Sequence, residues 1–67
     1  MSGEIWKAPG LLIQEYQVAY RAANKKPPPP VTYLNGWYRI SYPGGSRAFR
    51  KLSIIEMTYT LNRRAGE

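Results

Sequence analysis

The sequence contains no cysteine, no histidine and no aspartate, and glutamate supplies all 4 of its acidic residues. Without cysteine there is neither a disulfide framework nor a thiolate metal site. Without histidine or aspartate the usual zinc, calcium and acid–base constellations cannot be assembled. We therefore expect no metal, no cofactor and no enzymatic activity, and no need for an oxidising compartment.

Long hydrophobic segments are also missing. The longest strictly apolar run is Leu11-Leu12-Ile13, whereas a membrane-spanning helix needs roughly 20 apolar residues. The first residues, Met1 to Glu4, do not form a basic region followed by an apolar one, as a secretory signal would. We expect a soluble, cytoplasmic protein without a membrane partner, and 67 residues allow one small domain.

Positive charge dominates what is present. Lysine and arginine number 10, the net charge is +6, and the isoelectric point is about 10.0. From Tyr16 to Ile55 there is no acidic residue at all. An acid-free basic stretch of this length favours a polyanionic partner, nucleic acid before a membrane surface.

A helical period opens the domain. After a leader over residues 1–10, whose Ile5 and Trp6 are expected to dock on the core, apolar residues recur on one face of a helix predicted over residues 11–24. The proline run 27–30 then forces extended polyproline II. We interpret this run as a stiff spacer, and the alternative is a ligand for an SH3-like or WW-like groove.

A β-meander follows the prolines. Asn35-Gly36 lies between β-branched and aromatic residues, a pattern that predicts a hairpin with a two-residue type I′ turn. A second turn over residues 43–46, centred on Gly44-Gly45, leads to a third strand over residues 47–51. The resulting register sets the following residues opposite each other: Tyr33 and Tyr38, Thr32 and Arg39, Val31 and Ile40, then Ile40 and Phe49, Arg39 and Arg50, Ser41 and Ala48.

Side chains alternate between the two faces of this predicted sheet. One face is the core face, edged by Arg47 and Lys51. The other face carries Thr32, Leu34, Trp37, Arg39, Ser41, Ala48 and Arg50. This second face is either open for binding or covered by the first helix or by Trp6, and the pattern leaves both alternatives open.

The last element is a helix predicted over residues 54–64. Ser53 and Glu56 match a capping box, and Leu52 with Met57 matches a hydrophobic staple. The expected fold is α+β, in the order helix, three-stranded antiparallel meander, helix, as one domain over residues 11–64 with a tail over residues 65–67. Its predicted core consists of Leu12, Tyr16, Tyr20, Val31, Tyr33, Tyr38, Ile40, Phe49, Ile54, Met57 and Leu61.

The basic-aromatic sheet face suggests a DNA-binding surface. A β-ribbon fits the major groove of a duplex, where arginine contacts guanine O6 and N7. We assign the guanine contacts to Arg39 and Arg50, and contacts with a phosphate or a thymine methyl group to Trp37. Phosphate contacts are expected from Lys25, Lys26 and Lys51. The alternative for Trp37 is stacking on single-stranded bases.

Residues 28–62 resemble the arm-type DNA-binding domain of phage tyrosine recombinases, a three-stranded sheet with one C-terminal helix related to the plant AP2 domain. The matching features are Pro29-Pro30 before a strand with Tyr33, the turn Asn35-Gly36-Trp37-Tyr38, Tyr42, and Pro43-x-Gly45 before a basic strand. In that family the sheet enters the major groove, which by position implicates Trp37, Arg39, Arg47 and Arg50.

Two departures from the family shape what the resemblance implies. A helix precedes the sheet, and no catalytic domain follows it. The resemblance therefore implies a free-standing DNA-binding accessory or regulatory protein of a phage or mobile element, with double-stranded DNA as its partner.

Two alternatives involve a protein partner. The chain could be an inhibitor or adaptor of a larger acidic protein, with Trp37, Arg39 and Tyr42 as hot spots. It could also be a small virion-assembly protein that oligomerises through Trp6 or the first helix, since helix, hairpin, helix is also the layout of small phage head-completion proteins.

Overall fold

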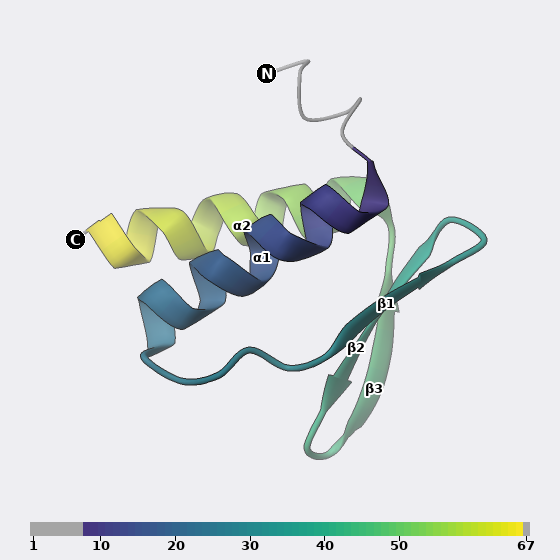
Figure 1. The fold of residues 1–67 in the computed structure, drawn as a ribbon, viewed down its shortest axis with the longest axis horizontal. Coiled ribbons are helices and arrows are strands. Elements are labelled where there is room, and N and C mark those ends of the chain that lie inside the picture. Colours follow the sequence, from purple (N-terminus) through teal and green to yellow (C-terminus); the bar gives the residue numbers. More distant parts are fainter. Residues whose placement is uncertain (1–7, 67) are drawn as a thin grey trace.

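The computed structural model of the chain describes residues 8–66. Figure 1 shows two layers, a pair of helices lying on one side of a three-stranded sheet. The elements follow in the order α1 (Pro9–Asn24), β1 (Val31–Leu34), β2 (Trp37–Tyr42), β3 (Gly45–Phe49) and α2 (Lys51–Gly66). The predicted α+β order of helix, antiparallel meander and helix is confirmed.

Helix α1 starts earlier than predicted and ends where predicted. Its first residue is Pro9, not Leu11. Proline is well tolerated at the first position of a helix, because the backbone N–H that it lacks would have no hydrogen-bond partner within the helix there. Lys25 adopts φ 58 and donates its amide to the Arg21 carbonyl at 2.8 Å, which closes the helix after Asn24. The predicted docking of Ile5 and Trp6 lies outside the described residues.

The proline run is tied to both layers. Gln17 in α1 donates from Nε2 to the Pro29 carbonyl at 3.4 Å. The Ser41 amide in β2 donates to the Pro30 carbonyl at 3.0 Å. These two hydrogen bonds connect the proline run to α1 on one side and to the sheet on the other.

The first hairpin has the predicted register. Val31 pairs with Ile40 and Tyr33 with Tyr38 in an antiparallel ladder. Asn35 (φ 51) and Gly36 (φ 84) form the two-residue loop, and both positive angles are those of a type I′ turn.

The register predicted for the second hairpin is wrong by two residues. Tyr42 pairs with Gly45, so the loop is Pro43-Gly44, and Arg39 lies opposite Ala48 instead of Arg50. Proline presets the φ angle of the first loop residue, while Gly45 adopts φ 140, which a residue with a Cβ rarely takes. A shift by two residues keeps every side chain on its predicted face, so the division into two faces survives.

The core lies between the core face of the sheet and the helices. Tyr38 and Ile40 of β2 and Ile54 of α2 are fully buried. Tyr33 is wrongly predicted as core, since it lies on edge strand β1 and stays 44% exposed. The buried core consists of Leu12, Tyr16, Ala19, Tyr38, Ile40, Ile54 and Leu61.

Helix α2 begins after a single intervening residue, Arg50, and three residues before the predicted start. Its first residue is Lys51, and the Ile54 amide donates to the Arg50 carbonyl at 3.1 Å. The predicted capping box is therefore wrong, because Ser53 lies inside the first turn and not at its cap. The helix also extends through Gly66, into the segment predicted as a tail.

Candidate nucleic-acid interface

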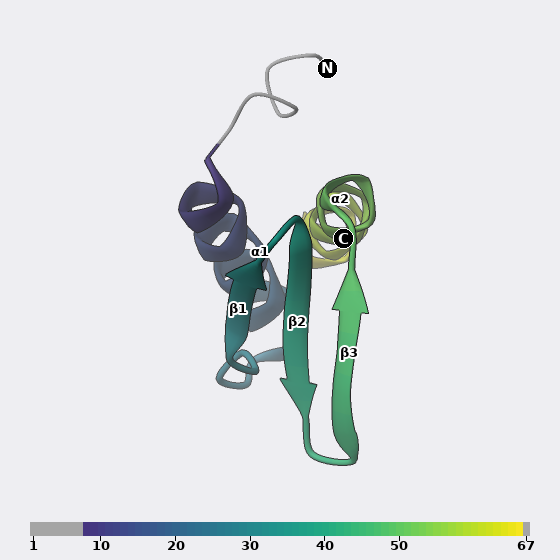
Figure 2. The same ribbon diagram turned by 90° about the vertical axis from the view of Figure 1, so that its right-hand side faces the viewer.

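The side of the sheet that faces away from the helices is open. In Figure 2 the three strands lie in front and both helices lie behind them. We call this side the outer face. Its side chains are all exposed and comprise Thr32, Leu34, Trp37, Arg39, Ser41, Ser46, Ala48 and Arg50. Within residues 8–66 the covered alternative is excluded, since α1 packs on the opposite side, and the proposed cover by Trp6 lies outside the described residues.

Two arginines dominate the chemistry of the outer face. The Arg50 guanidinium carbon lies 3.8 Å from the centroid of the Trp37 ring, and its Nη1 donates to the Gly36 carbonyl at 3.4 Å. Arg39 donates from Nη1 to the Ser46 hydroxyl at 3.3 Å. Each guanidinium is thus held by one hydrogen bond, and because a guanidinium carries five N–H donors, each keeps further donors beyond that bond.

The apolar part of the outer face lies at the first hairpin. Leu34 is 72% exposed and Trp37 is 42% exposed, and the two residues pair with each other next to the turn. Large apolar side chains that remain solvated on a sheet face are typical of a contact surface.

Among the described residues, none on the sheet is acidic. Among residues 8–66 the acids are Glu15 and Glu56, which lie in α1 and α2. The electrostatic potential of the outer face is therefore positive, as a phosphate-binding surface requires.

The structure divides the predicted site residues among four places. Trp37, Arg39 and Arg50 come together on the outer face. Arg47 is exposed on β3 but belongs to the core side, opposite Ile40. Lys51 is the half-buried first residue of α2. Lys25 and Lys26 follow α1 and lie at the far end of the helical layer (Figure 1).

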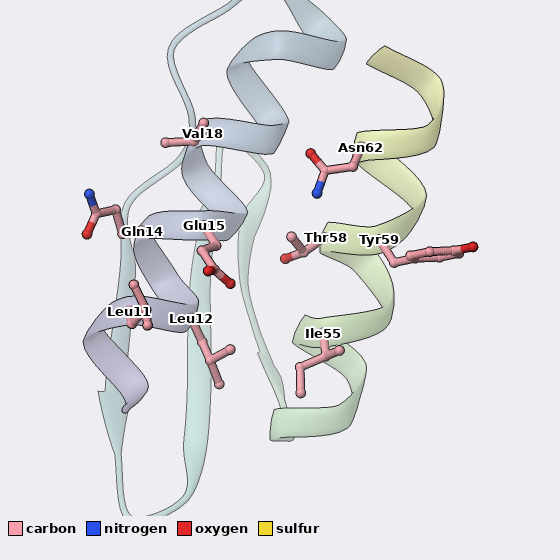
Figure 3. A pocket seen from close by; sticks show the side chains of 9 residues that line it. All are labelled: Leu11, Leu12, Gln14, Glu15, Val18, Ile55, Thr58, Tyr59 and Asn62. Carbon is pink, nitrogen blue, oxygen red and sulfur yellow. The ribbon is translucent and has the colours of Figure 1, made fainter. Parts of the chain in front are cut away.

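Two groups of functional interest were not predicted. The Gly36 carbonyl and the Ser46 hydroxyl orient the two arginines, and neither could be identified without the true register of β3. A groove of about 390 Å³ also lies between α1 and α2 on the side away from the sheet, as Figure 3 shows. Exposed Leu11, Val18 and Tyr59 line this inter-helix groove.

No protein family model, no curated protein and no solved structure matches this chain. Residues 8–66 contain no cluster of three or more histidine, cysteine or acidic side chains that could hold a metal ion. Neither α1 nor α2, the helices of the described segment, has the length and apolar character needed to cross a bilayer.

Proposed function

We propose that this protein binds double-stranded DNA through its outer face, as a regulatory or accessory protein of a phage or mobile element. One observation carries the proposal: the outer face is uncovered by any described residue, holds Trp37, Arg39 and Arg50, and contains no acid. The resemblance of residues 28–62 to arm-type DNA-binding domains supports the genetic context.

The dimensions of the sheet suit a major groove. Neighbouring strands lie about 4.8 Å apart, so three strands span roughly 10 Å, and the groove is about 12 Å wide. Arg39 lies on the central strand β2, where a ribbon reaches furthest toward the base edges. It is the residue that would contact guanine O6 and N7.

Arg50, which stacks on Trp37, has a different role in the proposed complex from that of Arg39. Arg50 is held on Trp37 and on the Gly36 carbonyl, so little side-chain entropy remains to be lost when it meets a phosphate. It lies at the edge of the sheet, after β3, where a backbone would flank the groove. Arg50 therefore positions the duplex, and Arg39 supplies the base contact.

Fluorescence anisotropy of a labelled mixed-sequence duplex tests this proposal. Three phosphate contacts would weaken binding roughly 40-fold between about 50 and 200 mM salt. Arg39→Gln and Arg50→Gln should each lower affinity, and Arg50→Gln should reduce the salt slope by about 0.9. The charge-matched control Arg21→Gln changes the helical layer and should bind nearly as the unmodified chain does.

Two results would contradict the proposal. One is the absence of binding at about 50 mM salt. The other is equal loss of affinity in Arg21→Gln and the outer-face variants, which would show that net charge, and not the outer face, determines binding.

A second candidate is a virion-assembly role through α1. The inter-helix groove favours it, because Val18 is 63% exposed and Tyr59 is 65% exposed on its rim. Sedimentation equilibrium should then show an oligomer, which Val18→Lys reduces to a monomer. A monomer at all concentrations would rule out self-assembly through this groove.

A further inference from the structure

Positive charge also gathers at the C-terminal ends of the two helices. Both helices run in the same direction, so their last turns lie side by side (Figure 1). A side-chain hydrogen bond joins the two helix ends: Arg64 donates from Nη2 to Asn24 Oδ1 at 3.3 Å. We call the exposed cations here the helix-end cluster, which comprises Lys25, Lys26, Arg63 and Arg64.

Helix dipoles explain only part of this cluster. Each helix C-terminus is equivalent to roughly −0.5 charge, so two parallel ends supply about −1. The helix-end cluster brings four positive residues, Lys25, Lys26, Arg63 and Arg64, to that place. About three positive charges are therefore in excess of what the two helix ends neutralise, and Glu15 and Glu56, the acids among residues 8–66, lie in earlier turns of their helices.

The helix-end cluster and the outer face point in different directions. The molecule measures 33 × 32 × 15 Å, and along its longest axis the helix ends lie on one side and the sheet on the other (Figure 1). Figure 2 looks at the outer face with the helix ends behind the sheet. A straight duplex lying on the outer face runs across the sheet and leads away from the helix ends.

We propose that the helix-end cluster is a second phosphate-binding surface, and that the protein bridges two DNA duplex segments, one on each surface. This inference rests on the proposed function of the outer face. The helix-end cluster offers lysine and arginine donors without a β-ribbon, so it contacts the phosphodiester backbone and does not discriminate sequence.

Within the cluster the residues differ in how free they are. Lys25 follows the last turn of α1 in the left-handed region, and Lys26 is exposed after it. Arg64 is engaged with Asn24, and the Arg63 guanidinium carbon lies 6.0 Å from the Tyr59 ring centroid. Lys25, Lys26 and Arg63 are therefore the residues to remove, since Arg64 holds the two helix ends together.

The experiment tests whether protein bound to one DNA duplex captures a second duplex. A biotinylated duplex on streptavidin beads is mixed with protein and with a second, dye-labelled duplex, and the retained dye is measured. The helix-end variant is Lys25→Gln/Lys26→Gln/Arg63→Gln. The matched variant Arg39→Gln/Arg47→Gln/Arg50→Gln removes the same number of charges from the sheet. Circular dichroism checks that both variants fold, and anisotropy first establishes whether each protein binds one duplex.

The unmodified protein should capture the second duplex. The helix-end variant should retain most of its affinity for a single duplex but lose capture by at least about tenfold. The sheet variant should also lose capture, and it should lose most of its affinity for a single duplex because only the non-specific phosphate contacts of the helix-end cluster remain. Binding of one duplex without capture by the unmodified protein overturns the bridging inference and leaves the proposed function standing. Unchanged capture by the helix-end variant also overturns it, because protein dimerisation would then make the bridge.

Two other results concern both proposals. If the helix-end variant loses single-duplex binding altogether, the cluster is the main site, and neither the outer-face function nor bridging holds. If the unmodified protein binds no duplex in the anisotropy measurement, the proposed function fails, and bridging fails with it.

Discussion

Arg50 lies with its guanidinium carbon 3.8 Å from the centroid of the Trp37 ring, and the same guanidinium donates to the Gly36 carbonyl at 3.4 Å. Arg50 is the single residue between β3 and α2, and Trp37 is the first residue of β2. The contact therefore joins the start of the second helix to the turn of the first hairpin across the outer face.

A double-mutant cycle measures this contact. Trp37→Ala and Arg50→Ala should each destabilise the protein, and the coupling between them in urea unfolding should be about 0.5–1 kcal/mol, as for an exposed cation–π pair. Arg47→Ala is the matched control, because Arg47 lies on the other side of β3 and should show no coupling with Trp37. Coupling of equal size in both pairs would contradict a specific stack.

Gly36→Ala should disturb the contact between Arg50 and the turn of the first hairpin, because it changes the backbone position that Arg50 contacts. Gly36 has φ +84, and an added Cβ would lie 3.0 Å from Arg50 Nη1. The left-handed conformation alone costs about 1–2 kcal/mol for a residue with a Cβ, so urea unfolding should show at least this loss. Gly44→Ala has open space within 4 Å and serves as the control, expected to change stability far less.

The two hairpins show why one register was predictable and the other was not. Asn35 and Gly36 both need positive φ, and no other neighbouring pair satisfies a type I′ loop, so the turn and the ladder were fixed together. The segment from Pro43 to Ser46 offers several turn centres. In the structure the loop is Pro43-Gly44, and this loop allows one more strand pair, Tyr42 with Gly45. The gain of that pair depends on the strands and cannot be predicted from the turn residues alone.

The candidate site was predictable in its faces but not in its contacts. Because side chains alternate between the two faces of a strand, Trp37, Arg39 and Arg50 lie on one side of the sheet in both the predicted and the observed register of the second hairpin. Whether α1 covers that side depends on the path of the prolines, which Gln17 and Ser41 fix through hydrogen bonds to the Pro29 and Pro30 carbonyls. Such long-range contacts leave no pattern in the local sequence.

Ser53→Ala tests the corrected start of α2. If Ser53 were the N-cap, its replacement would cost about 1 kcal/mol. Because Ser53 lies within the first turn after Lys51, the loss in thermal or urea unfolding should stay below about 0.5 kcal/mol. A loss near that of a true cap would show that the helix begins at residue 54 in solution.

Tyr38→Phe should stabilise the protein. The Tyr38 side chain is fully buried, and its hydroxyl has no hydrogen-bond partner among residues 8–66. A buried polar group without a partner costs about 1–3 kcal/mol, so removal of this hydroxyl should raise the unfolding midpoint. Tyr33→Phe, at a residue 44% exposed, should be close to neutral. A lower midpoint for Tyr38→Phe would show that the hydroxyl is bonded.

Alkaline pH should destabilise the fold through two buried tyrosines. Burial, with a smaller effect of Tyr42, raises the pKa of Tyr16 well above its usual value of 10.0. Burial, with a smaller effect of Tyr33, also raises the pKa of Tyr38. Above about pH 10 the unfolded chain loses these protons while the folded chain keeps them, so the free energy of unfolding falls as pH rises.

The size of this effect can be assigned to each residue. Each tyrosine contributes a slope of at most about 1.4 kcal/mol per pH unit, measured by urea unfolding between about pH 9 and 12. Tyr16→Phe and Tyr38→Phe should each remove one such contribution, since phenylalanine has no proton to lose. Tyr59→Phe, at a side chain 65% exposed, is the control and should keep the slope of the unmodified chain. An identical slope in all four proteins would contradict the assignment of the alkaline transition to the buried tyrosine hydroxyls.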